Sequence, residues 1–260
     1  MSHDSPYRRV ILLGASNLVR SLSTVVETVR LIWQEPVEIM AAIGHGRSYG
    51  QNSQVLGRKI SGIFPCALWQ DLQNRPPLPT AALVTDIGND LLYDVPVERL
   101  IAWVDGSLDR LTAVGADTIL TQLPMSSVRN VSEARYRLFR TLLFPKSSLS
   151  LTQVKRLAMD LNARLVATAE RRKIPAIPVS DAWYGFDPIH LKRSIARTAW
   201  PAILSAWRSD VVPIGVPRAS LRRWIYLHHL APYERSVFGL ERHCEQPSGI
   251  LDDGTTISFY

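Results

Sequence analysis

The sequence predicts an α/β protein with a three-layer, flavodoxin-like fold, in which helices cover both faces of a five-stranded parallel sheet. Two observations lead to this class. Short apolar segments alternate along the chain with longer segments of helical periodicity, which is the pattern of strand–helix–strand units. The chain has 260 residues, 46% of them hydrophobic, which is enough for a domain with a sizeable core.

Five short apolar runs predict the strands of this sheet. They are residues 9–13, 37–43, 81–87, 118–123 and 174–179. Apolar residues at helical spacing predict the helices between and after them. These are residues 17–33, 55–72 with an interruption at Pro65, 97–114, 133–143, 151–172 and 192–207. In an open parallel sheet of this kind, the ligand site lies beyond the carboxyl ends of the strands.

After about residue 209 the pattern changes, so we divide the chain into an α/β domain over 1–208 and a C-terminal extension over 209–260. The extension reads as a proline-containing linker at 211–217, a helix at 220–230 and a hairpin around Asp253-Gly254. The helix carries an apolar stripe that needs a cover. The cover is the α/β domain itself, a second subunit in a homodimer, or a membrane face.

Composition excludes several classes of protein and site. Cys66 and Cys244 lie far apart and are expected to be free thiols. We see no Cys/His cluster at zinc spacing and predict neither metal nor cofactor. The N-terminus lacks the apolar region of a signal peptide, and no apolar run is long enough to cross a membrane, so a cytoplasmic protein is expected.

The formal net charge of +7 is concentrated between residues 191 and 243, which we interpret as a solvated basic face. No Gly-x-Gly-x-x-Gly follows the first strand and no Walker loop occurs, so nucleotides and nucleic acids are not the expected partners.

Polar residues with catalytic potential follow three of the predicted strands. Ser16 comes directly after the first strand and opens a helix, which suits either a nucleophile or a plain helix cap. Asn89 follows the third strand, where its amide can bond a developing oxyanion or cap the next segment. Asp187 lies three residues before His190, so its carboxylate can fix the imidazole tautomer that takes a proton from serine.

Together these residues resemble the SGNH (GDSL-like) hydrolases over roughly residues 9–207. That family has a Gly-Asp-Ser-Leu-like block after the first strand, a glycine after the second, Gly-x-Asn-Asp after the third and Asp-x-x-His near the end. This chain departs from the pattern at Ala15 and Ile87. The resemblance implies a serine esterase that works through an acyl-enzyme, and 1–208 would be its hydrolase domain.

The resemblance also implies a role for each matching residue. Ser16 would be the nucleophile, His190 the base and Asp187 its orienter. The oxyanion hole would combine the N–H groups of Ser16 and a loop glycine with the Asn89 side chain. We prefer Gly50 to Gly46 as that glycine, because Gly50 follows Ser-Tyr and precedes polar residues.

Three alternatives to this interpretation stay open. Gly46-Arg47-Ser48-Tyr49-Gly50 matches the Gly-x-Ser-x-Gly nucleophile elbow, although only two strands precede it. An acyltransferase would use the same site on a different acceptor, and a non-catalytic binding module would keep only the pocket. The expected partner is a small-molecule ester, contacted by residues of three loops. These expected contacts are Asn17, His45, Gly46, Arg47, Tyr49, Trp183 and Tyr184.

Overall fold

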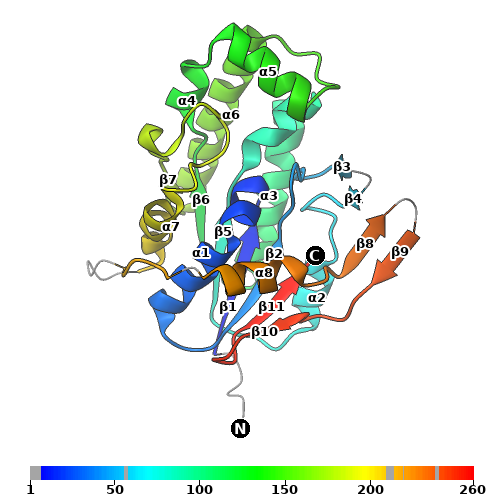
Figure 1. Ribbon diagram of the computed structural model, residues 1–260, viewed down its shortest axis with the longest axis vertical. Helices are drawn as coiled ribbons and strands as arrows, with labels where there is room; N and C mark the ends of the chain where they lie inside the picture. The colour runs from blue at the N-terminus through cyan, green and yellow to red at the C-terminus, as the bar shows by residue number, and fades with distance from the viewer. Residues whose placement is uncertain (1–6, 56–57, 209–213, 219, 238–239) are drawn as a thin grey trace.

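Seven strands form the central sheet of the computed structural model, in the order β10–β11–β2–β1–β5–β6–β7 (Figure 1). The structure describes residues 7–55, 58–208, 214–218, 220–237 and 240–260. The first six residues, on which the expectation of no signal peptide depends, and residues 211–213 of the predicted linker lie outside these ranges.

The five predicted strands are present and parallel, in the flavodoxin-like order. They are β1 (Arg8–Leu13), β2 (Val37–Ala42), β5 (Thr80–Val84), β6 (Asp117–Thr121) and β7 (Ala176–Ile177). Side chains alternate across β1, so that Val10 and Leu12 enter one core while Ile11 and Leu13 enter the other. Both faces are therefore buried, as a parallel sheet requires.

The predicted count of five strands is too low, because the C-terminal residues extend the sheet. β11 (Thr256–Phe259) pairs in parallel with β2, and β10 (Gly249–Ile250) pairs antiparallel with β11. The expected turn at Asp253-Gly254 does connect the two strands, with Gly254 at φ 88°. Ile257 is fully buried, so this part of the extension is continuous with the core of the sheet.

Helices cover both faces of the sheet (Figure 1). α1 (Ser16–Trp33) and α7 (Ala196–Leu204) pack on one face. α2 (Leu68–Asn74), α3 (Val97–Ala113) and α6 (Leu151–Arg172) pack on the other. α4 (Met125–Arg129) and α5 (Glu133–Leu143) lie between β6 and α6 in the chain. Short 3-10 helices span Ile87–Tyr93 (η1), Asp181–Trp183 (η2) and Ser205–Trp207 (η3).

The helix predicted over 55–72 is wrong. This segment forms the end of β3 (Ser53–Val55), then β4 (Arg58–Ile60), a turn, and α2 from Leu68 onward. Gly62 explains part of the difference, because a Cβ there would lie 2.6 Å from the backbone of Gly50. Because Gly62 has no side chain, two loops can approach each other closely here, and the segment does not form a helix. β3 and β4 join β8 (Glu234–Val237) and β9 (Leu240–His243) in a second sheet.

The C-terminal helix α8 (Leu221–His229) lies across α1. Leu227 is buried in the core beneath it, and Arg223 forms an ion pair with Glu27 of α1. The rest of the predicted apolar stripe is not covered in this way: Leu221 is 72% exposed and Trp224 is 43% exposed. The domain itself therefore covers only the inner edge of the helix, and a homodimer through the outer face stays a prediction.

We expect Ile257→Ala to lower the free energy of unfolding by about 2–5 kcal/mol, because it leaves a cavity beside β2. Ile250→Ala is the matched control, since Ile250 belongs to the same hairpin and is 54% exposed. Its effect should stay below about 0.5 kcal/mol. Urea denaturation of the three proteins measures both effects. Equal losses in the two variants would mean that β11 does not form part of the core sheet.

Candidate active site

Ser16 lies at the carboxyl end of β1 and is the first residue of α1. Its hydroxyl does not cap the helix, because no side-chain capping bond is present at this helix start. The Ser16 Oγ–H instead lies 2.8 Å from Nε2 of His190 and can donate to it. The plain helix-cap interpretation therefore does not describe this serine.

Asp187 and His190 lie in the loop that follows η2. His190 Nδ1 lies 2.6 Å from Oδ2 of Asp187, so the ring donates there and leaves Nε2 free to accept from Ser16. Oδ1 of Asp187 accepts the backbone N–H groups of Ile189 and His190. Burial alone would raise the pKa of Asp187, but these bonds outweigh it and lower the pKa. The carboxylate therefore stays charged beside the imidazole.

Asp86, which we did not predict as a site residue, holds the serine turn in place. It follows β5 with a left-handed backbone, at φ 58°. Its Oδ2 accepts the backbone N–H groups of Ala15 and Asn17, both at 3.0 Å. The N–H of Ser16, which lies between them, donates to no other described residue. Asp86 therefore fixes the turn and leaves the N–H of Ser16 available.

Asn17 connects this turn to the histidine loop. Its Nδ2 donates to Asp86 Oδ1 at 2.8 Å and to the carbonyl of Ile189 at 3.0 Å, and its Oδ1 accepts the N–H of Leu191 at 2.9 Å. The side chain is buried, and each of its polar atoms has a partner. Asn17 therefore positions the turn, and because it also lines the neighbouring cavity, the expected substrate contact there stays a prediction.

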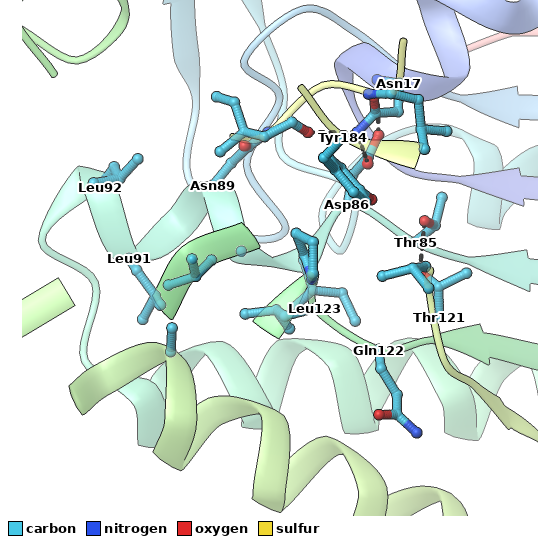
Figure 2. A pocket seen from close by; sticks show the side chains of 18 of the residues that line it. Asn17, Thr85, Asp86, Asn89, Leu91, Leu92, Thr121, Gln122, Leu123 and Tyr184 are labelled. Atoms are coloured by element: carbon cyan, nitrogen blue, oxygen red, sulfur yellow. Dashed lines mark hydrogen bonds between the residues drawn. The ribbon is translucent and has the colours of Figure 1, made fainter. Parts of the chain in front are cut away.

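Asn89 lies in η1, at the rim of a cavity of about 100 Å³. Figure 2 shows it across the cavity from Asp86 and Tyr184, with leucines below. The Asn89 side chain forms no hydrogen bond with the rest of the described chain. A half-buried amide without a partner at a cavity rim is available to a ligand.

The structure separates the two glycines considered for the oxyanion hole. The N–H of Gly50 donates to Ser48 Oγ at 3.1 Å, and a Cβ at Gly50 would overlap the Trp103 ring at 2.0 Å. Gly50 thus packs against α3 and its N–H is occupied. Gly46 adopts φ 61°, and its N–H donates to no residue in the described ranges. The preference for Gly50 is therefore not supported by this geometry, and Gly46 is the glycine whose N–H stays available.

Three residues of this loop point into the protein. Ser48 is fully buried and donates to Asp90, whose other oxygen accepts the N–H of Tyr49 at 3.0 Å. Tyr49 is also fully buried, and its hydroxyl donates to the carbonyl of Thr85 at 2.7 Å. Arg47 is fully buried and donates to the main-chain oxygen of Tyr260. The expected substrate contacts at Arg47 and Tyr49, and the alternative nucleophile Ser48, are thus closed off from a ligand.

The remaining expected contacts lie around the candidate site. The pKa of His45 is lowered by partial burial and by the positive charges of His190, Arg20 and His228, so these groups share one neighbourhood. Tyr184 lines the cavity of Figure 2, and burial raises its pKa well above the ordinary value. Trp183 packs its ring partly into the core, and its carbonyl accepts the N–H of Lys192 at 2.9 Å.

Helices α4 and α5 hold the histidine loop from outside, a feature that the sequence did not reveal. Arg135 donates to the carbonyls of Gly185 at 2.9 Å and Phe186 at 3.2 Å, and its guanidinium lies over the Phe186 ring. Ser127 donates to the carbonyl of Pro188 at 2.9 Å. The segment that carries Asp187 is therefore bonded on both sides, by these helices and by Asn17.

No protein-family model matches the sequence, and no curated protein matches it. Solved structures do match. TesA aligns with a TM-score of 0.50 at 12% identity, over 77% of this chain and 98% of that chain. The psychrotrophic esterase EstA from Pseudoalteromonas aligns with a TM-score of 0.49 at 11% identity, over 76% of this chain and 96% of that chain. The chain shares the fold of TesA. The likeness to TesA supports the fold alone, because the sequences have diverged so far.

The chain shows no group of three His, Cys, Asp or Glu side chains that could hold a metal ion, and no helix with the length and apolarity to cross a membrane, in the ranges that the structure describes. Cys66 and Cys244 are free thiols, as expected. The hydrogen-bonded group of Ser16, His190 and Asp187 is therefore the candidate active site.

We expect Asp90→Asn to remove a pH dependence of stability from this protein. Burial raises the pKa of Asp90 from 3.8 to about 6, against the opposing hydrogen bonds from Ser48 and Tyr49. Because the folded-state pKa is the higher one, the stability contributed by this group is full below about pH 4 and is lost as pH rises through about 6. The loss is of the order of 3 kcal/mol.

Free energies of unfolding from urea titrations between about pH 4 and pH 7 measure this effect. The wild type should lose more stability than Asp90→Asn across this interval. Two parallel pH profiles would show that Asp90 titrates alike in the folded and unfolded chains.

Proposed function

We propose that this chain is a serine esterase in which Ser16 is the nucleophile, His190 the general base and Asp187 the residue that orients it. One observation carries the proposal: an unbroken hydrogen-bond chain runs from Ser16 Oγ to His190 Nε2 at 2.8 Å and from His190 Nδ1 to Asp187 at 2.6 Å. Mere binding does not require a serine hydroxyl, an imidazole and a charged carboxylate in this order.

The first half of the reaction would form an acyl-enzyme. Ser16 Oγ attacks the ester carbonyl carbon while His190 Nε2 takes the hydroxyl proton. Negative charge then develops on the carbonyl oxygen, and the N–H of Ser16, the N–H of Gly46 and the Asn89 amide would stabilise it. When the intermediate collapses, the bond to the alcohol oxygen breaks and His190 gives its proton to that oxygen.

The second half would release the acid. A water molecule attacks the acyl carbon, His190 accepts a proton from it, and the bond to Ser16 Oγ breaks as the proton returns to the serine. Asp187 stays charged throughout, because its role is to hold the ring and to stabilise the imidazolium. The apolar cavity that begins at Asn89 is suited to receive the acyl group, since Leu91, Leu123 and Val128 line it.

The first test compares Ser16→Ala with Ser48→Ala in fluorophosphonate labelling and in hydrolysis of p-nitrophenyl acetate. Ser16→Ala should abolish labelling and lower turnover by about 10⁴–10⁶-fold, because the nucleophile is lost. Ser48→Ala should lower stability and still be labelled in the folded protein, since Ser48 is fully buried. Labelling that follows Ser48 instead would refute the proposed nucleophile.

The second test concerns the oxyanion hole. Asn89→Ala should lower kcat roughly 10²–10³-fold with little change in KM, because the amide acts mainly on the charge of the transition state. Steady-state kinetics on p-nitrophenyl acetate measure both constants. Gln122→Ala is the control, because Gln122 lines the far part of the same cavity and its amide donates to the carbonyl of Ala176. An unchanged kcat for Asn89→Ala would remove this residue from the mechanism.

A further inference from the structure

A second hollow, of about 720 Å³, lies between the end of α8, the β8–β9 hairpin and the loops after β2 and β4. In Figure 1 these segments come from both ends of the colour scale, the blue and cyan first third of the chain and the orange C-terminal segment. Its size is that of a ligand pocket and not of a packing defect. The mechanism proposed above uses none of the residues that line it.

His45 lies between this hollow and the candidate catalytic centre. Ile43 lines the hollow and lies two residues before His45, and His228 lines it from α8. His45 is close enough to feel the charge of both His228 and His190. α8 itself packs on α1, where Arg223 pairs with Glu27. The hollow and the apolar cavity share no lining residue, so they are two separate pockets.

The lining of the hollow presents acceptors and donors side by side. His228 Nδ1 lies 2.8 Å from the carbonyl of Trp224, and His229 Nδ1 lies 2.8 Å from that of Ile225. Both rings therefore donate through Nδ1 to the helix, and in the neutral form each keeps Nε2 free to accept. These are acceptors held at a fixed place, because the helix holds the rings.

The hairpin supplies the donors and a further acceptor. Arg235 and Arg242 lie directly opposite each other on β8 and β9, and Glu241 is the neighbour of Arg242. None of these three forms an ion pair with another residue in the described part of the chain. Like charges placed opposite each other destabilise a hairpin, so a ligand that bonds both guanidinium groups would relieve a cost.

An aromatic surface borders this lining. The ring of Trp224 stacks on His228, with 4.2 Å between the ring centroids, and Trp224 is 43% exposed. A half-exposed indole held by a histidine is a flat apolar face that lies next to hydrogen-bonding groups. A pyranose ring has the same combination, with C–H groups on its faces and hydroxyl groups around its edge.

We propose that this hollow binds the sugar part of an acylated saccharide, so that the C-terminal segment forms the alcohol-side pocket of the esterase. The assignment rests on the proposed function, because it makes the sugar the leaving alcohol of the ester that Ser16 attacks. Each sugar hydroxyl both donates and accepts, which matches a lining of guanidinium and carboxylate groups without ion pairs in the described chain and of imidazoles whose Nε2 is free. A simple anion would be opposed by Glu234 and Glu241, and an acyl chain would leave all these groups without partners.

The first experiment measures specificity. kcat/KM is determined for acetylated cellobiose and acetylated xylobiose, and separately for p-nitrophenyl acetate, which has no sugar. Arg235→Ala/Arg242→Ala and Trp224→Ala should each lower the ratio of saccharide ester to p-nitrophenyl acetate by about tenfold or more, through KM. Arg222→Ala is the control, because Arg222 is exposed on the same helix and does not line the hollow, and its ratio should stay unchanged.

The second experiment does not depend on catalysis. Ser16→Ala is titrated by calorimetry with unacylated xylo-, cello- and chito-oligosaccharides of two to four units, and with inorganic phosphate as a probe for a plain anion site. Binding of a saccharide that is lost in Ser16→Ala/Trp224→Ala supports the inference. Binding of phosphate alone, or of none of these ligands, overturns it.

The two sets of outcomes keep the proposals apart. If Ser16 is labelled and esters are cleaved, but the ratio and the calorimetry show no sugar preference, the pocket assignment fails and the esterase stands. If Ser16 is inert and a saccharide still binds in the Trp224-dependent manner, the esterase fails and the sugar site stands without its catalytic role.

Discussion

The candidate site depends on the hydrogen bonds that the carboxylate of Asp86 accepts. It lies at the end of β5 and accepts three N–H donors from the turn between β1 and α1, two from the backbone and one from Asn17. Asn17 carries this connection onward to the histidine loop through Ile189 and Leu191. Three segments that are distant in sequence are thereby fixed to one another. The Ser16 hydroxyl and the His190 ring then need no further movement to form their hydrogen bond. General-base catalysis requires such preorganisation.

Sequence patterns predicted the parallel core and the residues at the ends of its strands. Each predicted strand is an apolar run followed by polar residues. This pattern predicted that Ser16, Asn89 and His190 lie at one edge of the sheet. The same patterns did not separate Gly46 from Gly50, because the choice depends on where Ser48 points. Ser48 turns inward to Asp90, and this takes the N–H of Gly50 out of use. A bond between residues 42 positions apart leaves no local signal in the sequence.

The loop after β2 shows how one short segment serves two purposes. His45 lies near His190, and the N–H of Gly46 has no partner among the described residues, whereas Arg47, Ser48 and Tyr49 are fully buried. The buried residues bond to η1, to β5 and to the C-terminal strand, so they fix the loop at three places. Residues that looked like ligands in the sequence are thus the support for the few that can reach one. Polarity alone did not distinguish these roles, because a buried polar side chain and a ligand contact are the same residue types.

The pairing of β11 with β2 has a consequence for how the chain folds. Thr255 and Val37, which meet at the start of this pairing, are separated by 218 positions in the sequence. Closing so long a loop costs entropy before any contact repays it, so this pairing should form late. Until then the side of β2 that pairs with β11 is exposed, and all residues of β2 are ones that the folded protein buries. Such an edge strand can associate with other chains. The yield of folded protein during synthesis would therefore fall as the protein concentration rises, because association competes with the late pairing of β11.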